Sequence, residues 1–535
     1  MNPDYIIVGG GTAGCVLAGR LSEDRRHSVC LLEAGPRDDY LWIHIPIGYA
    51  KTMFHPVYNY GYYTEPDPYM NDRKIYWPRG RCLGGSSSIN GLIHIRGQAA
   101  DYDRWSAAGN PGWSWREVLP WFVRSEHNDD RRLQGTASHG TGGPLWATSI
   151  PEPHPLMEAI IAAGEELGVP RTIDFNGGQQ EGVGYYQLFT RNGWRCSTAV
   201  AYLRPARRRR NLRVEVDARV TRVLFEGTRA VGVEYVQRGV RQRLRANREV
   251  LLAAGALQSP QILMLSGIGP QEHLREHGIA PRQHLAGVGR NLQDHLQLRL
   301  MFKVKQPITT NDDLRSPWRK FGMGWRWITR RSGPLAIGIN HGGLFTRVLP
   351  ESTTPDIQFH FAALSAELAG AATHPWSGCT FSVCQLRPES RGEVRLGSAD
   401  PLAAPLMRSN YLSHETDRRC AIAAVRYARR LARAPALEGL IGEEYRPGDC
   451  AQSDDEMLGF ARQYGATIFH PAGTCKMAPA SDPDGVVDAT LRVRGVHGLR
   501  VIDASIMPTL VSGNTNAPIV MIAEKAAAMI AADAL

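Results

Sequence analysis

Three glycines and one acidic residue near the start of the chain have the types and spacing that bind a dinucleotide. Gly9, Gly11 and Gly14 form the pattern G-x-G-x-x-G, and Glu33 follows about 20 residues later. The first glycine of such a pattern permits a tight turn, the second lets the backbone approach a pyrophosphate, and the third lets a helix pack closely on a strand. Glu33 would hydrogen-bond a free ribose 2′-hydroxyl, so these residues predict FAD or NAD rather than NADP.

The segments around these glycines have the periodicity of a β-α-β unit. Residues 5–8 and 29–32 are short apolar runs that predict strands, and Leu17, Ala18 and Leu21 follow the glycines at helical spacing. A glycine-rich turn between a strand and a helix also occurs without a ligand. The two strands and the acidic residue in register favour the nucleotide site.

Two further glycine-rich stretches occur later in the chain. Residues 80–97 read GRCLGGSSSINGLIHIRG, and such small residues suit a backbone that wraps a phosphate or a flavin ring, although an ordinary Gly/Ser loop is the alternative. In residues 250–269, VLLAAGALQSPQILMLSGIG, an apolar strand at 250–253 reaches Gly255. We expect a helix to begin near Ser259–Pro260, because proline suits a first helical turn.

Composition and charge limit the class of protein. The 535 residues are 43% apolar and 21% charged, which supports a packed core and excludes wholesale disorder. The formal net charge of +10 is compatible with an acidic ligand, an anionic membrane surface or nucleic acid. The densest basic run, residues 207–210, has no interleaved aromatic residues. We therefore expect a solvated surface cluster and no nucleic-acid partner.

Cysteine usage and hydropathy bear on the compartment. The nine cysteines occur singly, without C-x-x-C spacing, which favours a reducing compartment and predicts no metal site. No stretch approaches 18 uninterrupted apolar residues, and the segment after Pro518, interrupted by Glu524 and Lys525, predicts a helix packed on the protein. We expect a cytoplasmic protein, with peripheral attachment to the inner membrane face as an alternative. The oligomeric state stays open.

The three glycine-rich clusters, in this order, resemble the glucose-methanol-choline (GMC) family of flavin oxidoreductases. Residues 80–90 and 255–269 are similar to its two signature stretches, and residues 467–478 and 491–518 are similar to its catalytic region. Residues 63–81 further resemble the bacterial branch that contains choline dehydrogenase and sorbose or aliphatic alcohol dehydrogenases. The resemblance runs from the first predicted strand to the last predicted helix.

The resemblance implies an α/β fold with two domains. A discontinuous Rossmann-like FAD-binding domain would be combined with a second, substrate-binding domain built on a mixed or antiparallel sheet. We expect an N-terminal FAD-binding region at 1–300, with an insertion of the substrate domain at about 155–195. Residues 301–460 would form most of the substrate domain, and residues 461–535 would return to the FAD domain and carry the catalytic pair.

The resemblance also implies non-covalent FAD, because relatives that attach it covalently have a histidine where this chain has Ile89. The nearest second fingerprint, around Gly287 and Gly289, lacks a third glycine and a preceding strand, so the electrons are expected to come directly from an organic substrate. Val220 would meet the adenine, and Asp503 the ribityl-phosphate region. The residues expected to contact FAD are Gly9, Gly11, Thr12, Ala13, Gly14, Glu33, Ala34, Gly84, Gly85, Ser86, Asn90, Gly91, Leu92, Ile93, Val220, Gly255, Asp503, Ala504, Asn516 and Ala517.

His470 and Asn514 match the catalytic pair of the family, whose second member is histidine in some relatives and asparagine in others. A lone histidine is otherwise more often structural, so this role depends on the resemblance. Neutral His470 would take the hydroxyl proton of an alcohol, and the carbon hydride would pass to flavin N5. The imidazolium and the Asn514 amide would stabilise the developing charge.

The expected product is an aldehyde or ketone, and the expected electron acceptor is a quinone or another carrier. An oxidase that uses oxygen and a lyase on the same fold are the alternatives. Choline-oxidising relatives carry a glutamate in the stretch that matches residues 339–345 (INHGGLF), where this chain has no carboxylate. This difference favours a small, neutral alcohol over choline. Residues 356–361 alternate in polarity and predict a half-buried strand, from which Gln358 or His360 would line the pocket or have a structural role.

Overall fold

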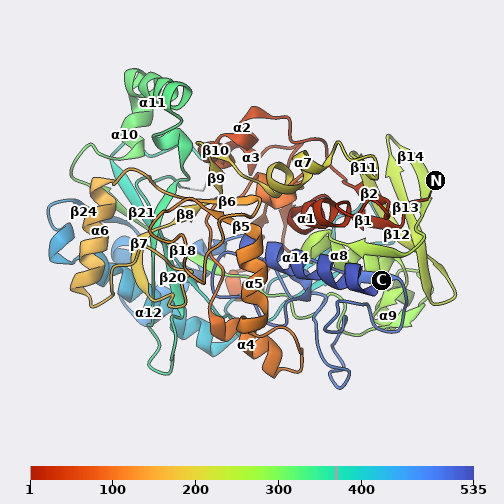
Figure 1. The fold of residues 1–535 in the computed structure, drawn as a ribbon. Helices are drawn as coiled ribbons and strands as arrows, with labels where there is room; N and C mark the ends of the chain where they lie inside the picture. The colour runs from red at the N-terminus through yellow and green to blue at the C-terminus, as the bar shows by residue number, and fades with distance from the viewer. Residues whose placement is uncertain (1, 368–370, 535) are drawn as a thin grey trace.

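The computed structural model describes residues 2–367 and 371–534, which form two lobes (Figure 1). One lobe, at the right of Figure 1, contains the first strands of the chain and the last helix, α14 (Asn516–Asp533). The other lobe is built around a large sheet and contains α6 (Pro155–Glu166) and α12 (Glu415–Ala432). Each lobe has its own large cluster of buried apolar side chains.

A parallel sheet of five strands organises the first lobe. Its spatial order is β11-β2-β1-β15-β26. The strands are β1 (Tyr5–Val8), β2 (Val29–Leu32), β11 (Leu212–Glu215), β15 (Glu249–Leu252) and β26 (Leu499–Val501). All residues of β1 and β2 are buried, as expected for parallel strands that are covered on both faces. The two strands predicted from the glycine fingerprint are confirmed.

Helices and a small antiparallel sheet cover this parallel sheet. Helix α1 (Thr12–Leu21) packs against α14, and β13 (Arg229–Gln237) contacts β15. Strand β13 lies between β12 (Ala218–Glu226) and β14 (Val240–Arg245). Most of α14 is buried, so the prediction of a packed C-terminal helix is confirmed. In the described ranges, no helix combines the length and hydropathy needed to cross a membrane.

Helix α8 (Gly255–Leu265) begins earlier than the sequence predicted. The carboxylate of Asp503 accepts hydrogen bonds from the backbone N–H of Gly255 at 2.9 Å and from the hydroxyl of Ser259 at 2.6 Å. A helix leaves its first N–H groups without intrahelical partners, and Asp503 satisfies one of them from a distant part of the chain. The expected start near Ser259–Pro260 is therefore wrong, because Pro260 lies inside the helix.

A second long-range contact lets α8 tolerate its internal proline. Pro260 has no N–H to donate to the carbonyl of Ala256, one turn earlier. The hydroxyl of Thr474 donates to that carbonyl oxygen at 2.5 Å instead. The helix therefore keeps the carbonyl paired through a residue from the C-terminal part of the chain.

An antiparallel sheet organises the second lobe. The order of its strands is β24-β18-β21-β20-β19-β7, and β25 (Ala466–Thr467) pairs beside β18. Every pairing in this sheet is antiparallel, so the antiparallel form of the two expected forms is observed. The remaining strands are β7 (Gly182–Tyr185), β18 (Leu296–Val304), β19 (Asn340–Thr346), β20 (Ile357–Ala362), β21 (Gly378–Gln385) and β24 (Ile441–Arg446).

Strand β20 shows where the sequence pattern misjudged burial. Phe359 and Phe361 belong to the apolar core of this lobe, and the alternate residues Gln358 and His360 point to the opposite face. All four side chains are buried. The predicted strand is confirmed, but its half-buried character is wrong, because the polar face is covered by the other lobe at a cavity.

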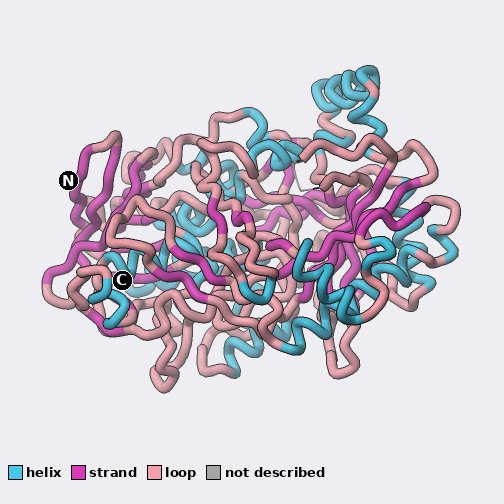
Figure 2. The backbone as a smooth tube through the Cα atoms, turned by 180° about the vertical axis from the view of Figure 1, so that it is seen from behind, coloured by secondary structure: helices cyan, strands magenta, loops and turns pink. Residues whose placement is uncertain are grey.

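The surface and the thiols agree with the composition. In the basic run of residues 207–210 only Arg209 is partly buried, and its guanidinium donates to the hydroxyl of Ser22 at 2.8 Å. The nine cysteines, all within the described residues, are free, and only Cys450 is exposed. Tube and ribbon views show that α10 (Thr310–Arg315) and α11 (Pro317–Arg330) project from the body of the second lobe (Figures 1 and 2).

Candidate active site

A cavity opens at the carboxyl ends of β1 and β2. In parallel sheets this edge is where nucleotides bind, because helix N-termini and flexible turns meet there. Arg79 and Tyr60 also contribute to the wall. The cavity is lined by twelve of the residues predicted from the sequence: Gly9, Gly11, Thr12, Ala13, Glu33, Ala34, Gly85, Ser86, Val220, Gly255, Asp503 and Ala504.

The glycines of the fingerprint have distinct roles. A Cβ on Gly14 would lie 1.9 Å from the carbonyl oxygen of Gly9, so Gly14 serves the packing of α1 on β1 and does not line the cavity. A Cβ on Gly11 would meet no protein atom closer than 3.9 Å, because this position faces the cavity. Gly84 has a φ of 86° and donates its N–H to the carbonyl of Gly10 at 2.7 Å, which is a structural contact.

Glu33 lies at the wall of the cavity with both carboxylate oxygens engaged. They accept hydrogen bonds from the backbone N–H groups of Gly10 at 2.7 Å and Gly35 at 2.8 Å. Burial raises the pKa of Glu33 to about 7, and the two N–H groups act in the opposite direction. Each carboxylate oxygen keeps a further lone pair, so Glu33 can still accept from ribose hydroxyls.

A second cavity adjoins the first. Thr12, Arg79, Ser86, Thr515 and Ile519 line both. Seven further predicted residues line the second cavity: Asn90, Gly91, Leu92, Ile93, His470, Asn514 and Asn516. The predicted residues that line neither cavity are Gly14, Gly84 and Ala517.

The residues that line the two cavities suit FAD. A Cβ on Gly91 or on Gly255 would meet nothing within 4 Å, so both glycines leave space that a planar group or a phosphate can fill. The first cavity holds the glycine cradle and Glu33, and the second holds the catalytic pair. Ile89 lines the second cavity, and its side chain offers no atom for a covalent link.

The loop after β25 holds His470 in place. Phe469 adopts a φ of 73°, a conformation that is unfavourable for a bulky residue. Its N–H donates to the hydroxyl of Thr467 at 2.7 Å, and its carbonyl accepts from Arg79 at 2.6 Å. The N–H of His470 donates to the carboxylate of Asp294 at 2.7 Å. The strained turn is therefore fixed on three sides.

The protonation of His470 is set by a second histidine. His295 Nε2 lies 2.9 Å from the carbonyl oxygen of Leu386, which can only accept, so this nitrogen carries the proton. His295 Nδ1 then accepts a hydrogen bond from His470 Nδ1, 2.9 Å away. This arrangement leaves the lone pair of His470 on Nε2. Burial lowers the pKa of His295 to about 4, so this imidazole is neutral at neutral pH.

A second series of hydrogen bonds orients Asn514. The hydroxyl of Tyr186 donates to the carbonyl of Phe359 at 2.6 Å and accepts from Gln358 Nε2 at 2.9 Å. Gln358 Nε2 also donates to Asn514 Oδ1 at 3.1 Å. The amide nitrogen of Asn514 is thereby turned toward His470 Nε2, at 3.3 Å. A base and a hydrogen-bond donor thus lie side by side, so that one alcohol oxygen placed next to the pair could donate to Nε2 and accept from the amide.

The electrostatic environment keeps His470 neutral. Burial, and then the neighbouring His295, His360 and Arg79, hold the pKa of His470 well below its usual value. His360 is itself fully buried at the cavity, and burial lowers its pKa to about 3. Neither ring nitrogen of His360 has a hydrogen-bond partner among the described residues. The cavity therefore contains neutral imidazoles that can accept or donate toward a ligand.

The charged groups of the second cavity are all basic. Arg79 and Arg299 line it, and no aspartate or glutamate of the described chain does. Burial lowers the pKa of each arginine to about 10, so both remain charged at neutral pH. Arg299 on β18 lies opposite Ser382 on β21, which in turn lies opposite His360 on β20. These three side chains share one face of the sheet, and this face is the floor of the cavity.

Asp294, His295, Arg79 and Arg299 were not predicted as site residues. A signal for one of them was present, because Gln297 and Arg299 alternate with leucines along β18 and predict a polar face of a strand. No local pattern marks Asp294 or His295, since their partner His470 lies 175 or more positions away along the chain.

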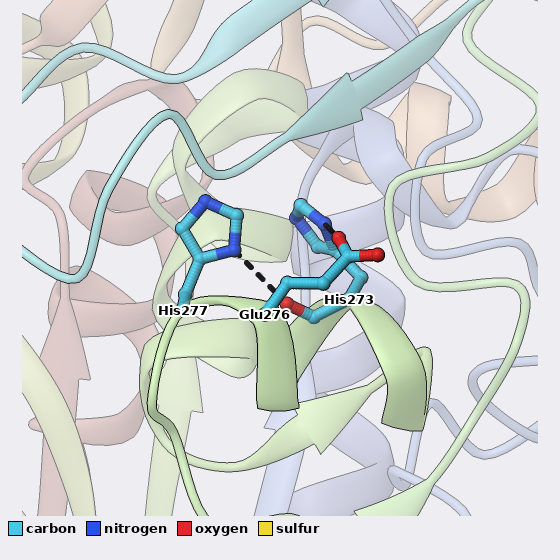
Figure 3. Close-up of side chains that lie close together, drawn as sticks. All are labelled: His273, Glu276 and His277. Atoms are coloured by element: carbon cyan, nitrogen blue, oxygen red, sulfur yellow. Dashed lines mark hydrogen bonds and ion pairs between the residues drawn. The ribbon is translucent and has the colours of Figure 1, made fainter.

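A separate cluster of possible metal ligands lies on α9 (Gln271–Glu276) and just after it (Figure 3). His273 Nδ1 lies 3.4 Å from Glu276, and its Nε2 accepts from the N–H of Leu396 at 3.1 Å. His277 Nδ1 donates to the carbonyl of His273 at 3.0 Å. Both nitrogens of His273 are thus engaged within the protein, and the absence of a metal site stays a prediction.

Comparison with known proteins places the chain in a family. Family models described as GMC oxidoreductase match residues 3–297 and residues 388–523. The chain belongs to the GMC oxidoreductase family. The family and the α/β fold class predicted from the glycine clusters are confirmed.

Relatives of the chain within this family match nearly its whole length. The mitochondrial choline dehydrogenase of Mus musculus is 45% identical over 98% of this chain and 89% of its own length. The alcohol dehydrogenase (acceptor) of Pseudomonas putida is 43% identical over 98% of this chain and 95% of its own. The crystal structure of pyridoxine 4-oxidase from Mesorbium loti matches with a TM-score of 0.89 at 33% identity, over 98% of this chain and 99% of that one.

Proposed function

We propose that the protein is an FAD-dependent dehydrogenase that oxidises the CH–OH group of a small, neutral alcohol to an aldehyde or ketone. As a GMC oxidoreductase, the chain is an FAD-dependent enzyme that acts on CH–OH donors. One observation carries the finer proposal: in the cavity beside the glycine cradle, His470 presents an Nε2 lone pair toward the amide nitrogen of Asn514. This pair can bind an alcohol oxygen and remove its proton.

The residues that would hold FAD follow from the cavities. The ADP half would lie along Gly9 and Gly11, with Glu33 at its ribose, and the flavin would lie along Asn90 and Gly91. When bound, FAD accepts the hydride that leaves the alcohol carbon. Binding would be non-covalent, which denaturation followed by filtration checks: the flavin should be released from the unfolded chain.

The side chains around the alcohol move and hold its proton. His470 Nε2 takes the hydroxyl proton, while His295 retains the Nδ1–H bond that keeps the imidazole in place. An N–H of Asn514 then donates to the alkoxide oxygen, and the positive charge on His470 stabilises the same oxygen. Both groups are already oriented before the alcohol binds, so little reorganisation accompanies the step.

The cavity charges support a substrate without a cationic group. Arg79 and Arg299 would repel a quaternary ammonium, and among the described lining residues no carboxylate compensates. We therefore expect 1-butanol to reduce the flavin faster than choline, although the sequence is 45% identical to a choline dehydrogenase. The variant Arg299→Glu should raise the rate of flavin reduction by choline relative to the rate by 1-butanol. Arg299→Gln is the matched control for loss of the positive charge. An unchanged ratio in Arg299→Glu would contradict this part of the proposal.

The catalytic assignment is tested by anaerobic stopped-flow reduction of the bound flavin. His470→Ala should slow reduction by about 10²–10⁴-fold, the usual contribution of a general base. Asn514→Ala should slow it less, because one donor to the alkoxide is lost and the base remains. His284→Ala, an exposed histidine outside both cavities, is the control and should reduce at the wild-type rate. Reduction of His470→Ala at the wild-type rate would refute the assignment.

The electron acceptor, the domain partition and the location are further parts of the proposal. We expect a quinone or another carrier to reoxidise the flavin, and a comparison of quinone or dye reduction with peroxide formation separates a dehydrogenase from an oxidase. The partition into 1–300, 301–460 and 461–535 is supported by β7, which adds a strand from the expected insertion to the antiparallel sheet. A cytoplasmic location stays a prediction that fractionation of cells would test.

A further inference from the structure

Helix α11 carries the most exposed large apolar side chains of the described chain. Trp318 is 84% exposed, Phe321 68%, Trp325 60% and Ile328 61%. The helix projects from the body of the protein in both views (Figures 1 and 2). Single exposed apolar residues are common on protein surfaces, but a cluster of this size on a protruding element marks a binding surface.

The spacing of these residues forms a stripe along the helix. At about 100° per residue, Trp318, Phe321, Trp325 and Ile328 lie within a sector of about 80°. The buried Trp327 lies on the opposite side of the helix. Its indole N–H donates to the carbonyl of Gly193 at 3.0 Å, which fixes the inner face to the protein. Helix α11 thus has two apolar faces, and only the inner one is covered.

Basic residues flank the uncovered stripe. The helix contains Arg319, Lys320, Arg326 and Arg330 and no acidic residue. Arg326 pairs with Glu152, and Arg319 lies 3.4 Å from Asp313. Lys320 and Arg330 have no ion-pair partner in the part of the chain that the structure describes, and both are exposed. An apolar stripe between cationic flanks is the arrangement that binds anionic lipid surfaces.

A second copy of the chain fits this surface less well. A helix of 14 residues, one face of which is already packed on the protein, is smaller than the roughly 20–30 residues per side of a stable interface. Two such helices would also bring like charges together. A bilayer needs no matching groove, and indole rings are favoured at its interface with water.

We propose that α11 is an interfacial anchor that inserts Trp318, Phe321, Trp325 and Ile328 into the surface of an anionic lipid bilayer. This proposal does not depend on the proposed reaction and applies whichever alcohol the enzyme oxidises. It lies parallel to the membrane plane, with its basic residues at the lipid headgroups.

The anchor also connects to the catalytic cavity. After α11 the chain runs through a short 3₁₀ turn, Pro334–Ala336, to Ile339 and Asn340, which line the cavity of His470. The N–H of Ile339 donates to the hydroxyl of Tyr49 at 3.2 Å, and Tyr49 lines the same cavity. Membrane attachment would therefore place this wall of the cavity near the bilayer, where apolar alcohols and quinones are concentrated.

Flotation of the full-length, FAD-loaded protein with lipid vesicles tests the anchor. One set of vesicles contains phosphatidylcholine alone, and the other contains roughly 30% phosphatidylglycerol. The wild type should float with the anionic vesicles and be released by high salt. The double variant Trp318→Ser/Trp325→Ser should lose partitioning by about tenfold or more. The control Tyr63→Ser/Val240→Ser removes two other exposed apolar residues and should float like the wild type.

Flavin reduction by alcohol in solution should be the same in all these proteins, since none of the substituted residues lines a cavity. This measurement shows that the variants are folded and separates the anchor from the catalytic proposal. Failure of the wild type to bind either set of vesicles would overturn the anchor, as would full binding by the α11 double variant. Equal binding to neutral and anionic vesicles would overturn the proposal that the bilayer surface must be anionic. Self-association that Trp318→Ser/Trp325→Ser abolishes, without vesicle binding, would assign α11 to a subunit interface instead.

Discussion

The hydrogen bond between His295 and His470 decides which nitrogen of His470 can act as a base. With His295 Nδ1 as acceptor, the proton of His470 stays on Nδ1 and the lone pair stays on Nε2. Asparagine and leucine have nearly the same shape, but only asparagine carries an oxygen that can accept this hydrogen bond. The variants His295→Asn and His295→Leu therefore form a pair of similar shape, of which only the asparagine can accept a hydrogen bond from Nδ1 of His470.

The structure sets the size of the expected effect. In His295→Leu the Nδ1–H of His470 would be left without a partner in a buried site, which costs about 1–3 kcal/mol. The imidazole of His470 avoids this cost when its proton moves from Nδ1 to Nε2. Nε2 then has no lone pair with which to accept the proton of the alcohol. At about 1.4 kcal/mol per decade, we expect flavin reduction to slow by about 5- to 150-fold. His295→Asn should remain within about fivefold of the wild type.

Anaerobic stopped-flow reduction at saturating alcohol measures this difference, and the dependence of the rate on alcohol concentration gives the affinity. The effect should fall on the limiting rate, because the base is lost and the walls of the cavity are unchanged. Thermal unfolding is the control for folding: both variants lose the bond to the carbonyl of Leu386, and their stabilities should differ by no more than about 1–3 kcal/mol, the cost of the unpaired N–H. Equal limiting rates for His295→Leu and His295→Asn would refute the reasoning, because the acceptor would then have no influence on His470.

Three further predictions use other parts of the structure. Because burial holds the pKa of His470 well below 6.5, the rate of flavin reduction should be constant from about pH 9 to about pH 6.5. The rate should fall only in more acidic solution, where the Nε2 lone pair is protonated. A rate that has fallen to half its maximum at pH 7 or above would contradict this prediction. Gly11→Ala should weaken FAD binding by about tenfold or more in a fluorescence titration and leave the stability of the apoprotein unchanged. Gly14→Ala should destabilise the apoprotein itself, because its Cβ would lie 1.9 Å from a backbone oxygen. The same phenotype in both variants would count against separate roles for the two glycines. Thr474→Val should lower the free energy of unfolding in urea by about 1–3 kcal/mol, because the carbonyl of Ala256 loses its partner, and Thr474→Ser should restore most of it.

The nucleotide-binding half of the protein could be predicted from the sequence because its signals are local. Gly9, Gly11 and Gly14 act on neighbouring turns, and the strands on either side are short continuous apolar runs, as expected for parallel strands buried on both faces. Burial was harder to predict than periodicity. Along β20 the alternation of Phe359 and His360 indicated two faces correctly, but the burial of the polar face depends on the other lobe, which no residue of the strand encodes.

The start of α8 and the support of His470 could not be predicted for the same reason. Pro260 indicated a first helical turn, and only Asp503 and Thr474, more than 200 positions away, allow the helix to begin at Gly255. The role of His470 was inferred from the family resemblance, since an isolated histidine has no diagnostic neighbours. In each case the residue types are ordinary, and the chemistry arises from partners that only the folded chain brings together.

The catalytic pair takes its orientation from two backbone carbonyls. The carbonyl of Leu386 fixes His295 and through it His470, and the carbonyl of Phe359 fixes Tyr186 and Gln358 and through them Asn514. A carbonyl oxygen accepts at every pH, so neither end of this network can reverse its direction by titration. Both carbonyls belong to the lobe with the antiparallel sheet, at β20 and just after β21. It follows that this lobe fixes the lone pair of the base as well as forming the floor of the cavity, and that the base is set only while the two lobes are packed together.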